Sequence, residues 1–369
     1  MVTILHTADV HLDRACSAMG MSQGIASARR EELRAALRRF VDLAIEMEAD
    51  AVTIGGDLFE HDRATLDTGH FLRQQFGRLA RVRVLIAPGN HDPYVPDSLY
   101  RRVEWPANVT IFQTPQFHPV NLAPGVTIWG AGHDGPALRR NLLEGFRVRG
   151  PGRHLLLFHG SDTRAVPEGK AVHAPFSGDD VAATGADFAL LGHYHGARLH
   201  PEDKPRFAYP GSPEALDFGE EGTHYVLRLD ASETDVRPEL LAFGRIAFST
   251  HRLDITPMTT SEEVRSAIWL LSAGGIVRVV LEGQLQPEMD LEVAALYNSC
   301  AERFAFLDIV DRTEPGYDFA QLAEESTTKG VFVRLMSARL EGAPPDERET
   351  IREALVIGLR AFDRRELSV

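Results

Sequence analysis

Short runs of apolar residues recur along the first two thirds of this chain, and each leads directly into a polar loop. Such runs occur at Ala51–Ile54, Val82–Ala87, His154–Phe158 and Asp187–Leu191, and the loops after them carry Gly, Asp, Asn or His. Buried strands that end in polar loops are how α/β enzymes assemble their active sites. The pattern therefore predicts an α/β fold with a functional site at the strand ends.

An amphipathic helix is predicted over Arg29–Glu48, where apolar residues recur at i, i+4, i+7 and i+8 from Leu33 to Ile45. The arginines of this segment lie largely off the apolar stripe and either form a solvated face or meet nucleic acid. Together with the strands, the helix predicts two packed sheets with helices outside. The arginines in question are Arg30, Arg34, Arg38 and Arg39, and the remaining predicted strands are Val2–Thr7, Val126–Trp129, Phe207–Tyr209, Thr223–Leu229 and Ala247–Ile255, the last three closing a second sheet.

The character of the sequence changes near His251. Beyond it we expect helix Ser261–Ser272, strand Gly275–Gly283, helix Leu291–Arg303 and strand Phe304–Val310. This β-α-β pattern predicts a small α+β cap domain over residues 256–369, after a main domain over residues 1–255.

Two helical stretches, about Asp318–Leu340 and Glu347–Arg360, are expected to end the cap domain. Their apolar residues recur at helical spacing, and these either pack within the cap or form a docking face for a partner helix. The apolar residues are Leu322, Phe332, Leu335, Ile351, Leu355, Ile357 and Leu359.

The acidic balance of the chain limits how it can meet nucleic acid. The formal net charge is -14, which argues against a protein that coats DNA or RNA by charge alone. It does not exclude an enzyme that holds phosphates through metals, because carboxylate ligands make the metal-free protein more negative. Only Lys170, Lys204 and Lys329 of the 39 basic residues are lysines. This reflects either a use of Arg as bidentate phosphate ligand or a general compositional bias.

Signals for export and for membrane insertion are not recognisable in the sequence. No run of about 18 apolar residues occurs, and the opening Met1–His6 lacks the basic and apolar regions of a secretory signal. Cys16 and Cys300 lie in distant segments, which does not suggest a disulfide framework. We therefore expect a cytoplasmic protein with no membrane association.

Five blocks of His, Asp and Asn follow the predicted strands. Imidazole and carboxylate bind borderline divalent metals such as Mn, Fe, Zn or Co, and an Asn carbonyl oxygen adds a ligand without charge. So many convergent His and Asp residues rarely serve packing, so the blocks together predict a metal centre. The blocks are Asp9-Val10-His11, Gly55-Gly56-Asp57, Gly89-Asn90-His91-Asp92, His159-Gly160 and Gly192-His193-Tyr194-His195.

The spacing within the blocks suggests how the side chains converge. On an extended segment, residues i and i+2 point the same way, so Asp9 and His11 can meet one ion, and the same holds for His193 and His195. The glycines before Asp57 leave its carboxylate free to turn between two ions. Two metals about 3.5–4 Å apart form a clamp suited to displacement at phosphorus. His91 is placed to stabilise the phosphate or to donate a proton to the departing oxygen.

Taken in this order, the blocks resemble the calcineurin-like metallophosphoesterase superfamily over residues 1–255. The resemblance implies a four-layer sandwich, in which two β-sheets are flanked by helices. It also implies a role for each residue of the centre. One metal would be held by Asp9, His11, Asp57 and His195, the other by Asp57, Asn90, His159 and His193, and His91 would be the catalytic imidazole.

Three further segments resemble the double-strand-break repair nuclease branch, the SbcD-like exonucleases. They are the opening Ile4–Asp13, the Gly-Gly-Asp-Leu-Phe of Gly55–Phe59 and the Tyr-Pro-Gly-Ser-Pro-Glu of Tyr209–Glu214. The overall layout is most similar to the bacterial YhaO-type subgroup of DNA repair exonuclease family proteins. The resemblance implies manganese-dependent hydrolysis of phosphodiester bonds in DNA, a coiled-coil ATPase partner of the SbcC type, and a homodimer.

Two other functions are compatible with the same residues. One is a phosphatase or phosphodiesterase for a small molecule, and the other is a scaffold that recruits a DNA end or an ATPase. Several residues near the blocks either support the site or belong to packing and loops. They are His6, Asp13, Cys16, His61, Asp62, Trp105, Trp129, His133 and Asp134.

Overall fold

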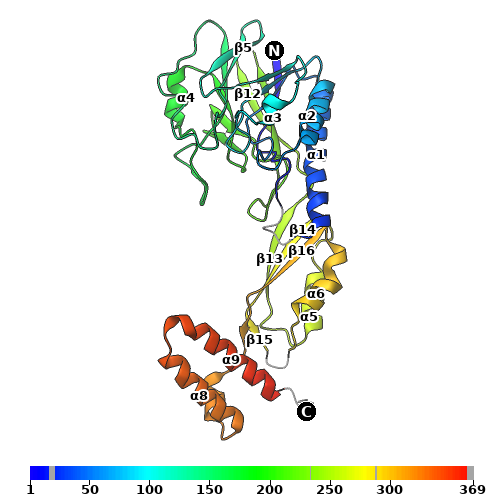
Figure 1. The fold of residues 1–369 in the computed structure, drawn as a ribbon, viewed down its shortest axis with the longest axis vertical. Helices are drawn as coiled ribbons and strands as arrows, with labels where there is room; N and C mark the ends of the chain where they lie inside the picture. Colours follow the sequence, from blue (N-terminus) through cyan, green and yellow to red (C-terminus); the bar gives the residue numbers. More distant parts are fainter. Residues whose placement is uncertain (16–20, 233, 287–288, 364–369) are drawn as a thin grey trace. The chain divides into compact units, whose positions relative to one another are not determined.

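Two six-stranded sheets form the first of two units into which the chain divides, Met1–Phe248 and Ser249–Val369. The computed structural model (Figure 1) describes residues 1–15, 21–232, 234–286 and 289–363. The chain is thus a mixed α/β protein. The main domain was expected to end at residue 255. The chain divides after Phe248, at the start of strand β13 (Phe248–Asp254).

Parallel strands form the centre of both sheets of the first unit. In the first sheet, β1 to β4 are parallel and β11 and β12 run antiparallel at one side; in the second, β6, β7, β8 and β10 are parallel. The first sheet has the order β12 (Val236–Ala242), β11 (Tyr225–Ala231), β1 (Val2–Thr7), β2 (Ala51–Ile54), β3 (Arg83–Ile86), β4 (Val109–Ile111). The second has the order β5 (His118–Ala123), β6 (Val126–Gly130), β7 (Arg153–His159), β8 (Phe188–Gly192), β10 (Phe207–Tyr209), β9 (Arg198–His200).

The two sheets pack face to face and are covered by helices outside. Ile4 and Leu85 of the first sheet share one buried cluster with Ile128, Leu155 and Leu190 of the second. A second cluster joins the outer face of the first sheet to α1 (Gln23–Glu46) and α2 (Leu66–Arg78), and a third joins the second sheet to α4 (Gly178–Thr184). The helices lie on opposite sides of the paired sheets (Figure 1), which gives the expected layers of helix, sheet, sheet and helix. A short helix, α3 (Leu99–Arg102), follows β3.

Helix α1 begins earlier than its apolar pattern predicts, because the Ser22 hydroxyl caps it at the backbone N–H of Ile25. The apolar stripe is buried as expected, except for Ile45, which is 44% exposed in the last turn. The arginines of α1 are engaged within the protein: Arg39 pairs with the buried Glu214, and Arg34 with Asp67. These arginines therefore form neither a fully solvated face nor a face left free for nucleic acid, which were the two alternatives.

Two of the three strands expected to close the second sheet lie elsewhere. Phe207–Tyr209 does join the second sheet as β10, but β11 pairs antiparallel with β1 of the first sheet. Strand β13 pairs with β14 (Ile276–Glu282) in the second unit. Alternation of apolar residues tells which face of a strand is buried, but the same alternation fits either sheet, so the sequence could not decide between them.

The second unit contains the expected β-α-β arrangement. Its sheet has the order β13, β14, β16 (Phe306–Asp311), and α5 (Ser261–Trp269) and α6 (Val293–Cys300) share a buried cluster with β14 that includes Ile268, Val279 and Cys300. A 3-10 turn (Ala301–Arg303) follows α6, and β15 (Gln284–Leu285) pairs with β17 (Glu314–Pro315).

In the described part of the second unit, three helices follow the sheet rather than the two expected. They are α7 (Phe319–Glu324), α8 (Thr328–Gly342) and α9 (Pro345–Asp363). The stretch predicted as one helix breaks after Glu324 because the Thr327 hydroxyl accepts the Gly330 N–H and starts a new helix. Among the described helices, none combines the length and the apolar character needed to cross a membrane.

Candidate metal centre

Loops after β1, β2, β3, β7 and β8 bring the predicted ligands to one place. The two sheets meet there through glycine: a Cβ at Gly55, after β2, would lie 2.9 Å from the backbone N of Gly192, which ends β8. Any side chain at Gly55 would hold the sheets apart. Ligand atoms of three groups lie within 4.8 Å of one another, namely Asp9, His11 and His195; His11, Asp57 and His91; and Asp57, His159 and His193.

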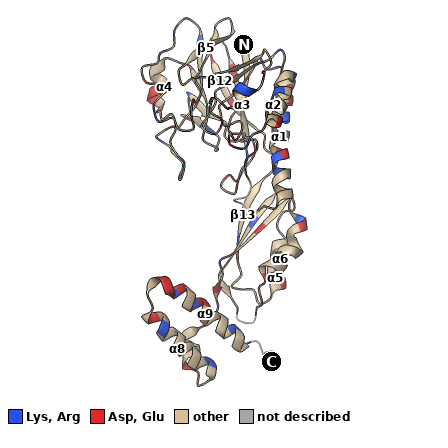
Figure 2. Ribbon diagram, viewed as in Figure 1, with Lys and Arg blue, Asp and Glu red and all other residues tan. Residues whose placement is uncertain are grey.

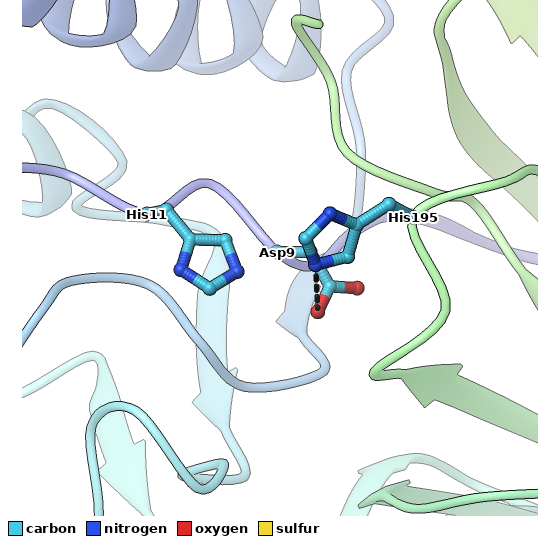
Figure 3. Close-up of side chains that lie close together, drawn as sticks. All are labelled: Asp9, His11 and His195. Atoms are coloured by element: carbon cyan, nitrogen blue, oxygen red, sulfur yellow. Dashed lines mark ion pairs between the residues drawn. The ribbon is translucent and has the colours of Figure 1, made fainter. Parts of the chain in front are cut away.

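The first cluster consists of Asp9, His11 and His195 (Figure 3). Nε2 of His195 lies 4.0 Å from Oδ1 of Asp9. Two glutamates fix the imidazoles through their Nδ1 atoms. His195 Nδ1 lies 2.5 Å from Glu220 Oε1, and His11 Nδ1 lies 2.8 Å from Glu60 Oε1. Nε2 of His11 is buried and has no hydrogen-bond partner among the described residues. A buried, unpartnered imidazole nitrogen facing two carboxylates fits a bound cation.

The second cluster consists of Asp57, His159 and His193, with Asn90 beside them. His159 Nδ1 donates to the Gly55 carbonyl oxygen at 2.8 Å, which leaves a lone pair on Nε2. That Nε2 faces Asn90 Oδ1 at 3.0 Å. With the amide oriented in this way, two acceptors face each other with no proton between them. A cation between them would satisfy both, so this cluster also fits a metal.

Asp57 lies between the two clusters. Its Oδ2 is 3.8 Å from His11 Nε2 on one side and 3.4 Å from His159 Nε2 on the other. Its Oδ1 accepts the backbone N–H of His91 at 2.8 Å, which fixes the plane of the carboxylate. The geometry therefore favours one carboxylate oxygen that serves both halves of the centre.

Burial sets the charge state of these groups when no metal is bound. It raises the pKa of the Asp9 and Asp57 carboxyls to about 7 and lowers the pKa of the His11 and His193 imidazoles to about 3. Burial likewise lowers the pKa of His159 well below its ordinary value. Neutral imidazoles next to buried carboxyls form a donor set that a divalent cation would complete.

The backbone is not extended at Asp9, His11 or His193, so the extended geometry expected for the Asp9/His11 and His193/His195 pairs is wrong. His195 lies with Asp9 and His11, whereas His193 lies with Asp57 and His159. Asp9 and His11 have left-handed backbone, with φ of 53° and 49°. Asp57 and His193 also have positive φ, at 51° and 118°. The side chains thus converge through tight turns after the strands, in a conformation that non-glycine residues rarely adopt.

Asp92 ties the loops around Asp57 together, a role that the sequence did not reveal. The buried carboxylate accepts the backbone N–H groups of Asp57, Leu58 and Gly89 at 2.9, 2.8 and 2.6 Å. The Tyr100 hydroxyl donates to the same carboxylate at 2.6 Å. These bonds hold two ligand loops in fixed relation.

His91 stands at the mouth of the centre, with its side chain 45% exposed. Its Nδ1 lies 2.8 Å from Glu60 Oε2, so Glu60 joins His91 to His11. The hydrogen bond to Glu60 raises the pKa of His91 to about 9 in the metal-free protein. Beside His91 lies a hollow of about 500 Å³, lined also by His61, Asp62 and Val95. An imidazole in this position can meet a ligand in the hollow while a carboxylate supports it from behind.

Comparison with known proteins decides the family. The model of the calcineurin-like phosphoesterases matches residues 2–197. The chain belongs to this family. Metallophosphoesterases bind divalent metals and hydrolyse phosphoesters, and the clusters described above are able to hold such ions.

Two relatives give the resemblance more detail. The chain is 27% identical over 306 residues to the uncharacterized metallophosphoesterase YhaO of Bacillus subtilis, covering 79% of this chain and 74% of that protein. It is 28% identical over 243 residues to the DNA double-strand break repair protein Mre11 of Aeropyrum pernix, covering 60% of this chain and 56% of that protein. The chain is also similar to a dimetal phosphatase from Danio rerio, at 12% identity over 65% of this chain and 96% of that one, with a TM-score of 0.41.

The remaining candidates in this phosphoesterase differ in how near they come to the centre. His6 is buried between Thr53 Oγ1 at 2.9 Å and the Leu191 carbonyl at 3.0 Å, and so links the two sheets. His133 Nε2 lies 3.0 Å from the carbonyl oxygen of His159 and supports that loop. His61 and Asp62 line the hollow. Asp13 accepts a hydrogen bond from Thr68, and Asp134 is exposed. The indole N–H of Trp105 donates to the Tyr100 carbonyl oxygen, and that of Trp129 donates to His154 Nδ1. Cys16 lies outside the described residues.

Proposed function

We propose that this chain hydrolyses phosphodiester bonds in DNA with two divalent ions, as an SbcD-like exonuclease acting in DNA repair. The observation that carries the proposal is the position of Asp57 Oδ2, 3.8 and 3.4 Å from imidazole nitrogens of the two clusters. A carboxylate shared in this way is suited to a pair of ions about 3.5–4 Å apart. Similarity to Mre11, named as a DNA double-strand break repair protein, supports DNA as the substrate.

The residues that would hold the ions are those of the two clusters with Asn90. We propose manganese, with iron, zinc or cobalt as alternatives, because imidazole and carboxylate together suit such borderline metals. When bound, the ion pair would supply Lewis acidity that activates water and offsets the charge of the phosphate oxygens. One ion would use Asp9, His11, Asp57 and His195, and the other Asp57, Asn90, His159 and His193.

The chain's own contribution to the reaction centres on His91. Its imidazole faces the hollow, and Glu60 fixes its orientation through the 2.8 Å contact with Nδ1. The free Nε2 is then available to donate a hydrogen bond to a phosphate oxygen or a proton to the departing oxygen. The same glutamate holds His11 Nδ1, so movement of His91 is coupled to the first cluster.

We further propose that residues 1–255 form the nuclease domain and residues 256–369 a cap that docks an SbcC-like coiled-coil ATPase, and that the chain forms a homodimer. The net charge of -14 supports a need for partners at DNA. Figure 2 shows basic and acidic residues interleaved along α1 and α9, so neither helix presents an unbroken basic stripe. In the terminal helices, Val333, Leu355 and Leu359 are buried together, whereas Leu335 and Ile357 are each 67% exposed. The exposed pair supports docking beyond internal packing.

Hydrolysis of linear duplex and single-stranded DNA, with and without manganese, tests the proposal. The wild-type chain should release nucleotides only with the metal, and the His91→Ala variant should not. Small phosphodiesters and cyclic nucleotides assayed in parallel address the alternative substrate class. Turnover of these without any cleavage of DNA would replace the nuclease with a small-molecule phosphodiesterase. Full repair activity of His91→Ala in cells would instead favour a scaffold.

The partner proposal has a separate test. The chain should retain an SbcC-like ATPase on an affinity column, and Leu335→Glu or Ile357→Glu should weaken that retention. Glu341→Gln, a change on the exposed end of α8, serves as the control. Equal retention of all these variants would place the contact outside α8 and α9. Sedimentation of the purified chain reports whether it is a dimer.

A further inference from the structure

A loop over residues 161–174 lies against the metal centre between β7 and α4. It is anchored at both ends: the Ser161 N–H donates to the His173 carbonyl at 2.8 Å, and the Ala174 N–H donates to the Leu138 carbonyl at 2.6 Å. Its later part touches the His193/His195 block. The Ala171 carbonyl oxygen lies 2.9 Å from His193 Nε2. Both ends of the loop are therefore fixed, and its later part contacts a predicted metal ligand.

Lys170 on this loop makes the contact of most consequence. Its Nζ lies 3.1 Å from Nε2 of His195, and the lysine side chain is half-buried. An ammonium can only donate hydrogen bonds, so Nε2 must accept with its lone pair. On the other side of the ring, the carboxylate of Glu220 can only accept, so Nδ1 carries the proton. The lone pair that a metal would need thus points at a positively charged nitrogen.

We propose that Lys170 is a cation substitute and phosphate-positioning residue: its ammonium holds His195 in the metal-free protein, leaves when a divalent ion binds, and then contacts a phosphate oxygen of the substrate. The inference rests on the dimetal centre proposed above. An ammonium and a divalent ion cannot share one lone pair, and they repel each other at close range. Arrival of the ion must therefore displace the Lys170 ammonium from His195 Nε2, and a phosphate held at the ions would offer it a new acceptor.

The chemistry of lysine suits such an exchange of partners. A compact charge on a flexible four-carbon stem can move between acceptors, whereas the planar guanidinium of Arg prefers a fixed bidentate geometry. This chain uses Lys at only three positions among 39 basic residues, and one of the three is in contact with a proposed ligand. The favourable charge of Lys170 next to Asp9 also acts in the metal-free state, where it helps to hold down the pKa that burial raises.

Manganese binding to Lys170→Gln provides the first test. Glutamine keeps much of the length of the side chain but removes its charge, so manganese no longer competes with an ammonium for His195. Titration calorimetry and manganese electron paramagnetic resonance should give an affinity about tenfold tighter than wild type for one of the two ions, the scale of one charge-assisted hydrogen bond. Lys204→Gln, a change at an exposed lysine, is the matched control and should bind like wild type.

Binding of inorganic phosphate to the manganese-loaded proteins provides the second test. Lys170→Gln should bind phosphate roughly tenfold more weakly than wild type and Lys204→Gln, because one charge-assisted contact is lost. Tighter metal together with weaker phosphate is a pair of opposite changes that damage to the loop would not produce. Metal affinity that is unchanged or weaker in Lys170→Gln, or unchanged phosphate affinity, overturns the inference. Failure of the wild type to bind manganese would instead overturn the metal centre itself, and neither assay depends on DNA as the substrate.

Discussion

The two halves of the centre hold their imidazoles in different ways. In the first half, side-chain carboxylates support the histidines: Glu60 contacts His11 and Glu220 contacts His195. In the second half the supports are backbone carbonyl oxygens. Gly55 supports His159 and Ala171 supports His193.

This difference teaches how one centre can present two unlike sites. A carboxylate behind an imidazole adds negative charge and makes the ring a stronger ligand than a carbonyl does. Burial opposes the charge of Glu220, yet the hydrogen bond and charge of His195, together with hydrogen bonds from Ser212 and Leu216, outweigh burial and lower the pKa of Glu220 to about 2. The first half is therefore the more negative one and should bind a divalent ion more tightly. The second half depends on backbone carbonyl oxygens, which a substitution elsewhere on the chain does not delete.

Removal of the Asp57 carboxylate, which both halves share, should abolish the difference in metal affinity between the two halves. Asp57→Asn withdraws charge from both halves, so we expect both ions to be lost. Phosphodiester hydrolysis should fall on the order of 10⁴-fold, the scale for one member of an interdependent catalytic unit. Elemental analysis of the purified variant and a rate measurement check this. Retention of both ions would mean that Asp57 does not bridge the halves.

His91→Ala should separate catalysis from metal binding. The imidazole lies at the mouth and contacts Glu60, and its loss should lower the rate by about 10²- to 10⁴-fold, as is usual for a general acid or base. Both ions should remain, since neither half loses its support. Loss of metal from the variant would show instead that His91 belongs to the first half.

Removal of the metal should destabilise the first unit selectively. Chelation leaves the carboxyls of Asp9 and Asp57, whose pKa burial raises, without the charge of the ions. At a manganese concentration about 100 times Kd, the bound ion stabilises by about 2.7 kcal/mol, which corresponds to roughly 5–10 °C in Tm for a unit of this size. Scanning calorimetry with and without chelator measures it. Equal shifts in the transitions of both units would argue against a centre confined to Met1–Phe248.

Substitution of Glu220, with the smallest expected effect, tests most directly whether the two halves bind their ions independently. Glu220→Gln should weaken one ion by about 10- to 100-fold, the usual effect of removing a group that orients a ligand, and leave the other unchanged. The exposed neighbour Glu221→Gln is the control. Calorimetric titration with manganese distinguishes the two steps. If both ions weaken equally, the halves are not independent and the contrast drawn here does not hold.

Much of the fold followed from local pattern, and the rest depended on pairing. Strands β1, β2 and β10 have the predicted bounds because alternation and runs of apolar residues are local signals. Edge strands β4, β5, β9 and β12 were not predicted, since they are only partly buried and lack a clear apolar run. The membership of β11 in the first sheet depends on its contact with β1, more than two hundred residues away.

The site likewise has a part that local sequence pattern predicted and a part that depends on contacts between distant residues. The residues now seen to converge were found because they follow strands whose ends meet at one edge, although their roles as ligands are still a prediction. Glu60, Asp92 and Glu220 were missed or given no role, because one acidic residue in a polar loop has no distinctive sequence signal. Their importance appears only when contacts such as Glu220 with His195 are known. The contact of Lys170 with His195 has no sequence signature either.

The left-handed turns at Asp9, His11, Asp57 and His193 have a consequence for protein engineering. Each keeps a side chain in a backbone conformation that costs about 1–3 kcal/mol and that glycine adopts freely. A laboratory selection for heat resistance in metal-free medium would therefore favour glycine at these positions, because no bound ion would then offset the backbone cost. The selected variants would be more stable but unable to hold metal. Any redesign of this chain for thermal stability therefore has to keep these four residues unchanged.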